Sequence, residues 1–268
     1  MSEWAVRDVL DIPLQGLKQV AVRVVGGEVA VATGAGGDAR LTVRLEEGPP
    51  VEVRFSDGVL SVTHPDPPEG MLLRLLRSSS ATRRVSVQLV VPACVQAEIQ
   101  SVSAPVVVSG LQGPLTVRTV SGDIVLDGIG SPVDVMSVSG GLAARDLTSP
   151  LKVQTVSGSV AVAGGQAPSV RAQTVSGDVA LDIAHPQGEY SVQTVSGEVA
   201  LRTPAEPSLA LEASSVSGGL VSDFGLDWEG RRPGNRRLRS RLGDGGAKAR
   251  VRTVSGTLRV ARRREQAA

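Results

Sequence analysis

The chain has 268 residues, of which 41% are hydrophobic, and its 28 Lys and Arg against 27 Asp and Glu give a net charge of +1. This composition excludes a disordered chain and a protein with several membrane spans. Two His, one Tyr and one Cys leave few groups for catalysis, and a single Cys allows no intramolecular disulfide.

The start of the chain indicates the expected location. Residues 1–20 contain three acidic residues and no apolar run, so they are unlike a secretory signal peptide. No stretch of 18 apolar residues occurs, so we expect no transmembrane segment. The sequence therefore predicts a cytoplasmic protein, with a peripheral position at the cell envelope as the alternative.

Residues 1–100 are predicted to form strands that cap or extend the sheet following them in the same domain. Turn-forming residues separate short β-branched segments, and Asp57-Gly58 predicts a hairpin. Strand direction is expected to alternate here. The predicted strands are Val20–Val25, Glu28–Ala32, Leu41–Leu45, Val51–Phe55, Val59–Thr63, Val85–Val91 and Ala97–Val102.

One apolar cluster in this part, MLLRLLR at 71–77, has a helix-like pattern. Pro-rich and Ser-rich stretches flank it. We interpret it as a short helix or loop that packs over an open end of the sheet, with a membrane or partner contact as the alternative.

A short motif recurs through residues 101–260. Successive starts lie 18 to 21 residues apart, except for a last gap of 38, which we interpret as a coil that lost its motif and gained an insertion. A degenerate copy begins at Ser101. The tetrapeptide Ser/Thr-Val-Ser-Gly starts at Thr119, Ser137, Thr155, Thr174, Thr194, Ser215 and Thr253.

Each period predicts two short strands joined by a corner. In the segment LKVQTVSGSVAV, Leu151, Val153 and Thr155 alternate with polar residues, and a second alternating segment follows Gly158. The corner keeps the same place and composition in every copy, as stacked coils require. The sequence therefore predicts an all-β fold, a β-helix-like β-solenoid of about 18–21-residue coils stacked about 4.8 Å apart. An antiparallel sandwich is the alternative.

The hydroxyl residues of the motif are interpreted as a structural corner ladder. By strand parity Thr155 shares a face with Leu151 and Val153, so the threonines are expected to point inward. The alternative is a flat Thr-x-Ser face that binds an ordered surface such as ice or a polysaccharide. The ladder comprises Thr119, Ser121, Gly122, Thr155, Ser157, Gly158, Thr174, Ser176, Gly177, Thr194, Ser196, Gly197, Thr253, Ser255 and Gly256.

The charge is unevenly distributed. Residues 231–264 contain 13 Lys and Arg and one acid, whereas residues 1–230 contain 15 basic and 25 acidic residues. A basic insertion at 226–245 interrupts the coils, and a flexible basic tail is expected at 261–268. The arginines predict either a solvated loop or a site that binds an anionic surface or polyanion, such as phospholipid headgroups or nucleic acid. The candidate binding residues are Arg231, Arg232, Arg236, Arg237, Arg239 and Arg241.

The recurring TVSGDV and TVSGEV segments, together with Leu242–Ala247 and Val251–Val260, resemble a bacterial family of β-strand-repeat proteins, the putative-adhesin family, a domain of unknown function. The resemblance covers roughly residues 20–260. It implies a β-solenoid-like fold and often a cell-envelope or stress-related setting. It implies no catalytic residues.

These observations predict a non-catalytic, adhesin-like scaffold that self-associates. No nucleophile motif, phosphate-binding loop or metal-ligand spacing occurs, so no catalytic site, metal or cofactor is expected. Aromatic residues are too few for sequence-specific nucleic-acid binding. The first alternative is an anion- or envelope-binding module that acts through residues 231–241. The second is a polysaccharide-acting enzyme built on a β-helix.

Overall fold

The computed structural model describes residues 2–34, 38–64, 83–228 and 236–263, and these form two compact units, residues 1–124 and 125–268. The described segments contain strands and no helix, so none of them is a helix that could cross a membrane. The predicted all-β solenoid is confirmed. The cluster at 71–77, the arginines at 231 and 232 and the tail beyond residue 263 lie outside the described residues.

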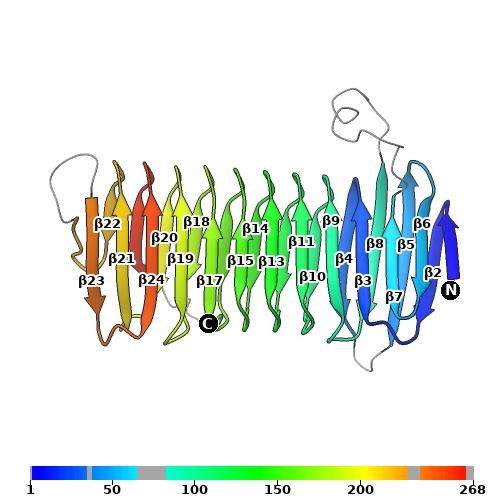
Figure 1. Ribbon diagram of the computed structural model, residues 1–268, viewed down its shortest axis with the longest axis horizontal. Coiled ribbons are helices and arrows are strands. Elements are labelled where there is room, and N and C mark those ends of the chain that lie inside the picture. Colours follow the sequence, from blue (N-terminus) through cyan, green and yellow to red (C-terminus); the bar gives the residue numbers. More distant parts are fainter. Residues whose placement is uncertain (1, 35–37, 65–82, 229–235, 264–268) are drawn as a thin grey trace. The chain divides into compact units, whose positions relative to one another are not determined.

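The first unit mixes parallel and antiparallel strands (Figure 1). Its strands are β1 (Ser2–Val6), β2 (Val9–Leu14), β3 (Gln19–Val24), β4 (Gly27–Thr33), β5 (Ala39–Glu47), β6 (Val51–Ser56), β7 (Val59–Thr63), β8 (Arg84–Val91), β9 (Gln96–Ser101), β10 (Val106–Ser109) and β11 (Leu115–Thr119). One sheet has the order β1-β6-β7-β3-β9-β11 and the other β2-β5-β8-β4-β10. The pairs β1–β6, β6–β7, β2–β5 and β5–β8 are antiparallel, which confirms the expected alternation.

The predicted hairpin is present. Asp57 and Gly58 have φ angles of 54° and 82°, and Ser56 pairs with Val59, so these two residues form a tight turn between β6 and β7. The sequence missed β1 and β2, whose side chains are mostly exposed or half-buried and so lack a clear apolar pattern.

The second unit contains two sheets of stacked strands, and β12 (Ile124–Asp127) crosses the boundary between the units. One sheet has the order β13-β15-β17-β19-β24-β21-β23 and the other β14-β16-β18-β20-β25-β22. The strands of the first sheet are β13 (Val133–Ser137), β15 (Leu151–Gln154), β17 (Ser169–Gln173), β19 (Glu189–Thr194), β21 (Leu209–Ser215), β23 (Arg236–Leu242) and β24 (Ala247–Thr253). Those of the second are β14 (Leu142–Arg145), β16 (Val160–Ala163), β18 (Val179–Asp182), β20 (Val199–Thr203), β22 (Leu220–Ser222) and β25 (Leu258–Arg262).

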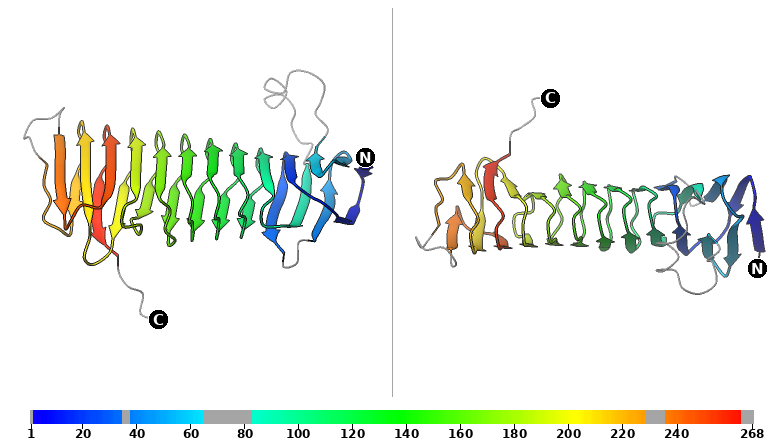
Figure 2. Two further views of the ribbon diagram at one scale, coloured as in Figure 1. Left: turned by 60° about the horizontal axis from the view of Figure 1, so that its bottom comes forward. Right: turned by 90° about the horizontal axis from the view of Figure 1, so that it is seen from above.

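Equivalent residues of successive copies pair directly. Leu151 pairs with Val133 on one side and with Val170 on the other, in parallel register. Each coil therefore contributes one strand to each of the two layers that Figure 2 shows. Inward positions are filled by Val, Leu, Ile and Ala, and the threonines of the motif are buried with them, such as Thr155 at 7% exposure.

The interpretation of the 38-residue gap as a coil that lost its motif is wrong. The coil of β21 and β22 keeps its motif at Ser215, and the chain then adds the antiparallel strand β23 on its outer side. The last coil, β24 and β25, returns into the space between the β19–β20 coil and the β21–β22 coil, pairing in parallel with both. Chain order and spatial order therefore differ at this end of the unit.

The corner is held by one repeated hydrogen bond. The Gly158 N–H donates to Thr155 Oγ1 at 3.1 Å, and the Gly177 N–H donates to Thr174 Oγ1 at 2.9 Å. The glycine is required because a Cβ on Gly158 would lie 2.1 Å from the Gly140 carbonyl oxygen of the neighbouring coil. At Thr194 the hydroxyl instead donates to the Ser196 carbonyl, at 2.9 Å.

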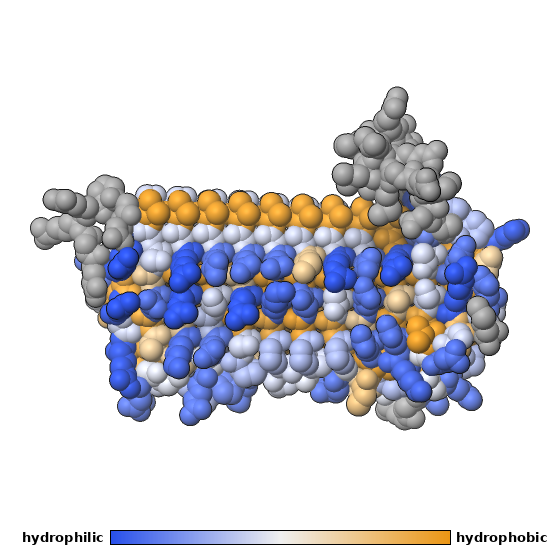
Figure 3. All heavy atoms as spheres, viewed as in Figure 1, coloured by the Kyte–Doolittle hydropathy of each residue, from blue (hydrophilic) through white to orange (hydrophobic). Residues whose placement is uncertain are grey.

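The valine of each motif points outward. In the second unit these side chains form a row, which we call the valine ridge, and each is 44–48% exposed. Figure 3 shows exposed apolar side chains in a row along the upper edge of the view. In spatial order the ridge consists of Val138, Val156, Val175, Val195, Val254 and Val216.

Candidate functional site

The strongest concentration of positive charge in the described residues lies on the outer face of β23, β21 and β24. The sequence of β23, RRLRSRL, alternates so that Leu238 is buried while Arg237, Arg239 and Arg241 face solvent. In β24, AKARVRT, Val251 is buried and the intervening Lys and Arg side chains are exposed.

Strand pairing arranges these side chains in three rows. Each row has a residue of β21 in the centre, a residue of β23 on one side and a residue of β24 on the other. Rows of this kind bring side chains from separate parts of the sequence within about 5 Å per strand. The rows are Arg241–Ala210–Lys248, Arg239–Glu212–Arg250 and Arg237–Ser214–Arg252.

The carboxylate of the middle row pairs with both arginines of that row, which leaves the row a net charge of +1. Glu212 accepts from Arg239 Nη2 at 3.2 Å and from Arg250 Nε at 3.1 Å. The hydrogen bond from Arg250, followed by that from Arg239, lowers the pKa of Glu212 below its ordinary value. Because all three groups are exposed, this network orients the side chains more than it stabilises the fold.

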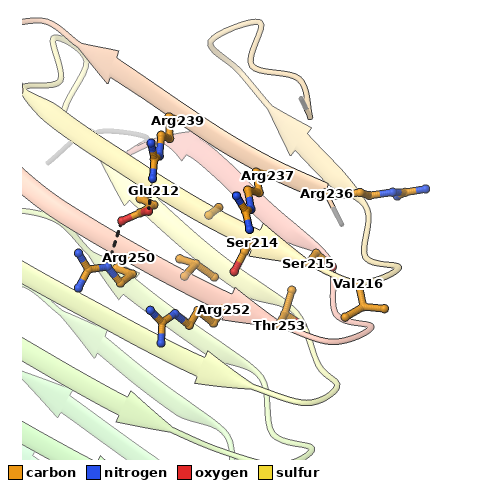
Figure 4. A pocket seen from close by; sticks show the side chains of 12 residues that line it. Glu212, Ser214, Ser215, Val216, Arg236, Arg237, Arg239, Arg250, Arg252 and Thr253 are labelled. Atoms are coloured by element: carbon orange, nitrogen blue, oxygen red, sulfur yellow. Dashed lines mark hydrogen bonds and ion pairs between the residues drawn. The ribbon is translucent and has the colours of Figure 1, made fainter. Parts of the chain in front are cut away.

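The row nearest the corner has no acid, which is also true of the Arg241–Ala210–Lys248 row, but only the corner row has two guanidinium groups on either side of a hydroxyl residue. Arg237 and Arg252 lie on either side of Ser214, and no carboxylate of the described residues pairs with either guanidinium. A groove of about 460 Å³ lies over this part of the sheet (Figure 4). Its lining residues include Glu212, Ser214, Val216, Arg237, Arg239, Arg250, Arg252 and Thr253. We call this the basic groove.

Two other arginines are held by backbone carbonyls. Arg236 Nη1 donates to the Gly218 carbonyl at 2.7 Å, which anchors the start of β23 beside the corner. Arg241 donates through Nε to the Asp244 carbonyl at 3.0 Å, at the turn between β23 and β24. Neither contact places an acid in the basic groove.

Four of the six candidate arginines, Arg236, Arg237, Arg239 and Arg241, are thus described, and they lie on a strand instead of in the expected insertion loop. Three of them, Arg236, Arg237 and Arg239, line the basic groove. The groove is also lined by residues that were not predicted from the sequence: Ser214, Arg250 and Arg252. The alternation of exposed basic residues in RRLRSRL and AKARVRT could have indicated two basic strands. Only the structure shows that both strands pair with β21.

The described residues contain no group of three or more His, Cys, Asp or Glu side chains that could hold a metal ion. The basic groove itself combines guanidinium groups with the half-buried Ser214, the buried Ser215 and Thr253, and a carboxylate that is paired with two arginines. Chemically, such a set of groups suits an oxyanion better than a cation.

The fold is similar to those of several crystal structures. One, from Parabacteroides distasonis and named as a putative lipid binding protein, has 11% identity and a TM-score of 0.52, with 97% of this chain and 98% of that chain covered. Putative adhesins from Parabacteroides distasonis and Bacteroides fragilis have 15% and 11% identity, each with a TM-score of 0.48; 96% of this chain is covered in both, and 97% and 98% of theirs. No curated protein matches the chain.

The family comparison covers most of the sequence. The model of the family described as Toastrack DUF4097 matches residues 9–261, which include the strands β2 to β24, most of β25 and the basic groove. This domain has no assigned function. Since the match extends over far more than half of the residues, the chain belongs to the Toastrack DUF4097 family.

Proposed function

We propose that this protein is a non-catalytic, adhesin-like scaffold that holds an anionic partner against its basic groove. The observation that carries the proposal is the Arg237–Ser214–Arg252 row, which presents two guanidinium groups without an acidic partner among the described residues. The name of the Parabacteroides distasonis neighbour is in keeping with a binding role.

The geometry suits a phosphate-like group. The backbones of Arg237 and Arg252 are two strand spacings apart, about 10 Å, so one ligand above Ser214 is within the reach of both long side chains. A guanidinium can donate two parallel hydrogen bonds to one oxyanion, and a hydroxyl can add a third donor. A group with several negatively charged oxygens is therefore the ligand that this row fits.

The direct test uses inorganic polyphosphate as the probe and isothermal titration calorimetry as the measurement. We expect binding that weakens as salt is raised, because displaced counterions return to the phosphate chain. Replacing both arginines, Arg237→Gln with Arg252→Gln, should weaken binding by about tenfold for each arginine removed, because hydrogen bonds to charged groups are the strong ones.

The control is Arg145→Gln with Arg259→Gln, which removes the same charge from the opposite sheet of the same unit. Absence of binding at low salt, or equal weakening by the control pair, would overturn the proposal.

A further inference from the structure

The valine ridge is a rigid apolar row with uniform spacing. Its six side chains differ little in exposure, from 44% to 48%, so no coil interrupts the row. Neighbouring coils are about 4.8 Å apart, and valine has a stiff first side-chain torsion. A partner that binds this row therefore restricts few side-chain torsions that were free before, so binding costs little side-chain entropy.

The polar groups next to the ridge are already bonded within the stack. The carbonyl of Val138 accepts from Ser157 N at 2.9 Å and from Ser157 Oγ at 3.2 Å. The same double contact joins Ser176 to Val156 and Ser217 to Val254. At these coils the ridge therefore presents methyl groups beside carbonyls that are already hydrogen-bonded, so an apolar surface without a fixed register suits it best.

The narrowness of the ridge distinguishes between apolar partners. Stable protein interfaces bury about 800 Å² on each partner, far more than a row one half-exposed side chain wide presents. A flat protein surface would touch only the crest of the row. Hydrocarbon chains can surround a narrow crest on both sides, as they do the apolar face of an interfacial helix.

The ridge is continuous with the basic groove. Val216 is one of the residues that line the groove, and Arg252 lies two residues before Val254 of the ridge. On the other flank of the ridge, the carboxylate of Glu198 pairs with Arg259 at 2.8 Å, and Asp178 accepts from Glu198 N at 2.7 Å. Where the apolar row meets the groove, it is bordered by Arg237 and Arg252, which have no acidic partner among the described residues, and this arrangement matches hydrocarbon bordered by phosphate.

From this juxtaposition we propose that the anionic partner is a phospholipid surface, and that the valine ridge inserts between the lipid chains while Arg237 and Arg252 hold headgroup phosphates. The inference rests on the proposed function of the basic groove and adds a second contact to it. It also predicts that the ridge valines lie in the hydrocarbon and that Arg237 and Arg252 remain at the headgroups.

The first experiment measures binding of the full chain to sonicated vesicles of phosphatidylcholine with phosphatidylglycerol. Val195→Ser should weaken vesicle binding about threefold, and Val175→Ser with Val195→Ser about tenfold, because each exchange removes apolar area that would leave water. Val221→Ser is the matched control, since Val221 is 46% exposed against 47% for Val195 but lies on β22 in the other sheet. Binding to polyphosphate should not change in any of the three variants.

The second experiment measures insertion. Tryptophan introduced as Val195→Trp should be quenched by brominated lipid chains after subtraction of the parent signal, and Val221→Trp should not. Vesicle binding that depends on Arg237 and Arg252 but is insensitive to all ridge variants would overturn this inference and leave the proposed function standing. A concentration-dependent dimer that Val195→Ser abolishes, without an effect on vesicles, would overturn it in favour of a second copy of the chain. If the parent protein binds neither the vesicles nor polyphosphate, the proposed function itself is overturned.

Discussion

Each residue of the corner motif has a separate structural role. The motif hydroxyl accepts one backbone N–H, the glycine allows the next coil to approach, and the valine side chain stays in solvent. Because these roles are separable, each can be tested by one substitution with a control in the same corner.

The adjacent glycines of one corner provide the first test. A Cβ on Gly218 would lie 2.0 Å from the Gly256 carbonyl oxygen, whereas the nearest atom to a Cβ on Gly219 is at 3.5 Å. Gly218→Ala should lower the free energy of unfolding by about 1–3 kcal/mol, as overpacking does, and Gly219→Ala should change it little. Urea denaturation followed by circular dichroism measures both. Equal effects would contradict the steric explanation.

The corner threonine provides the second test. Thr174→Val should destabilise the protein by about 1–3 kcal/mol, because the Gly177 N–H loses its buried acceptor. Thr174→Ser keeps the oxygen and should cost less. If the valine variant is as stable as the serine variant, the hydrogen bond contributes nothing measurable.

His64 gives the protein a pH-dependent stability. Burial, with a smaller contribution from the charge of Arg83, lowers the pKa of His64 below 6.5, and Val25 N–H donates to its Nδ1 at 3.3 Å. The native state therefore binds fewer protons than the unfolded chain just below pH 6.5. The stabilisation is complete above that pH and is lost as the pH falls towards the native pKa.

The measurement is the urea midpoint at about pH 7.5 and pH 5.5. The midpoint of the parent protein should fall more between these values than that of His64→Gln, which cannot protonate. Parallel changes in the two proteins would exclude His64 as the titrating group.

At the level of elements, the repeating coil could be predicted from the sequence, but the order of the coils in space could not. Alternation and the recurrent corner are local signals, so the paired strands β15 and β16 follow from residues 151–163 alone. The position of β24 between β19 and β21 is a choice among non-local partners that share one pattern. Arg237 could be predicted as a binding residue because it lies in a local run of arginines. Arg252 joins the candidate site only because its strand pairs with β21, which is a non-local contact.

Removal of residues 247–268 tests the returning coil. Without β24, both β19 and β21 lose a parallel neighbour, so hydrogen exchange should become faster at 189–194 and 209–215. The strands β13 and β15, which do not contact β24, should keep their protection. Retained protection at 209–215 would show that β21 and β23 are stable as a hairpin.

At the level of the whole molecule, the charge asymmetry has two structural consequences. The basic residues after position 230 form the groove, and they also border the edge strand β23. At the start of the chain, β2 is an edge strand with Pro13, which cannot donate to another strand. Charged and proline-containing edges oppose growth by strand pairing. Self-association by strand pairing is therefore not expected at these two edges, β23 and β2.

The arginines of β23 should therefore keep its edge from pairing. Changing Arg237, Arg239 and Arg241 together to Thr removes the repulsion and raises strand propensity, so the variant should associate at concentrations where the parent is monomeric. Light scattering across a concentration series measures the mass. A monomeric variant would show that the backbone geometry of β23, rather than its charge, blocks pairing.

The returning coil also constrains how the protein is made. A ribosome delivers β21 and β22 before β24 and β25, although the later pair occupies the inner position. Stacking of the coils in chain order can thus proceed only as far as Thr203, the end of β20, because the next strand in that sheet, β25, has not yet been made. Closure of this end consequently waits until β24 and β25 have been made, and until then the emerging chain carries an open sheet edge.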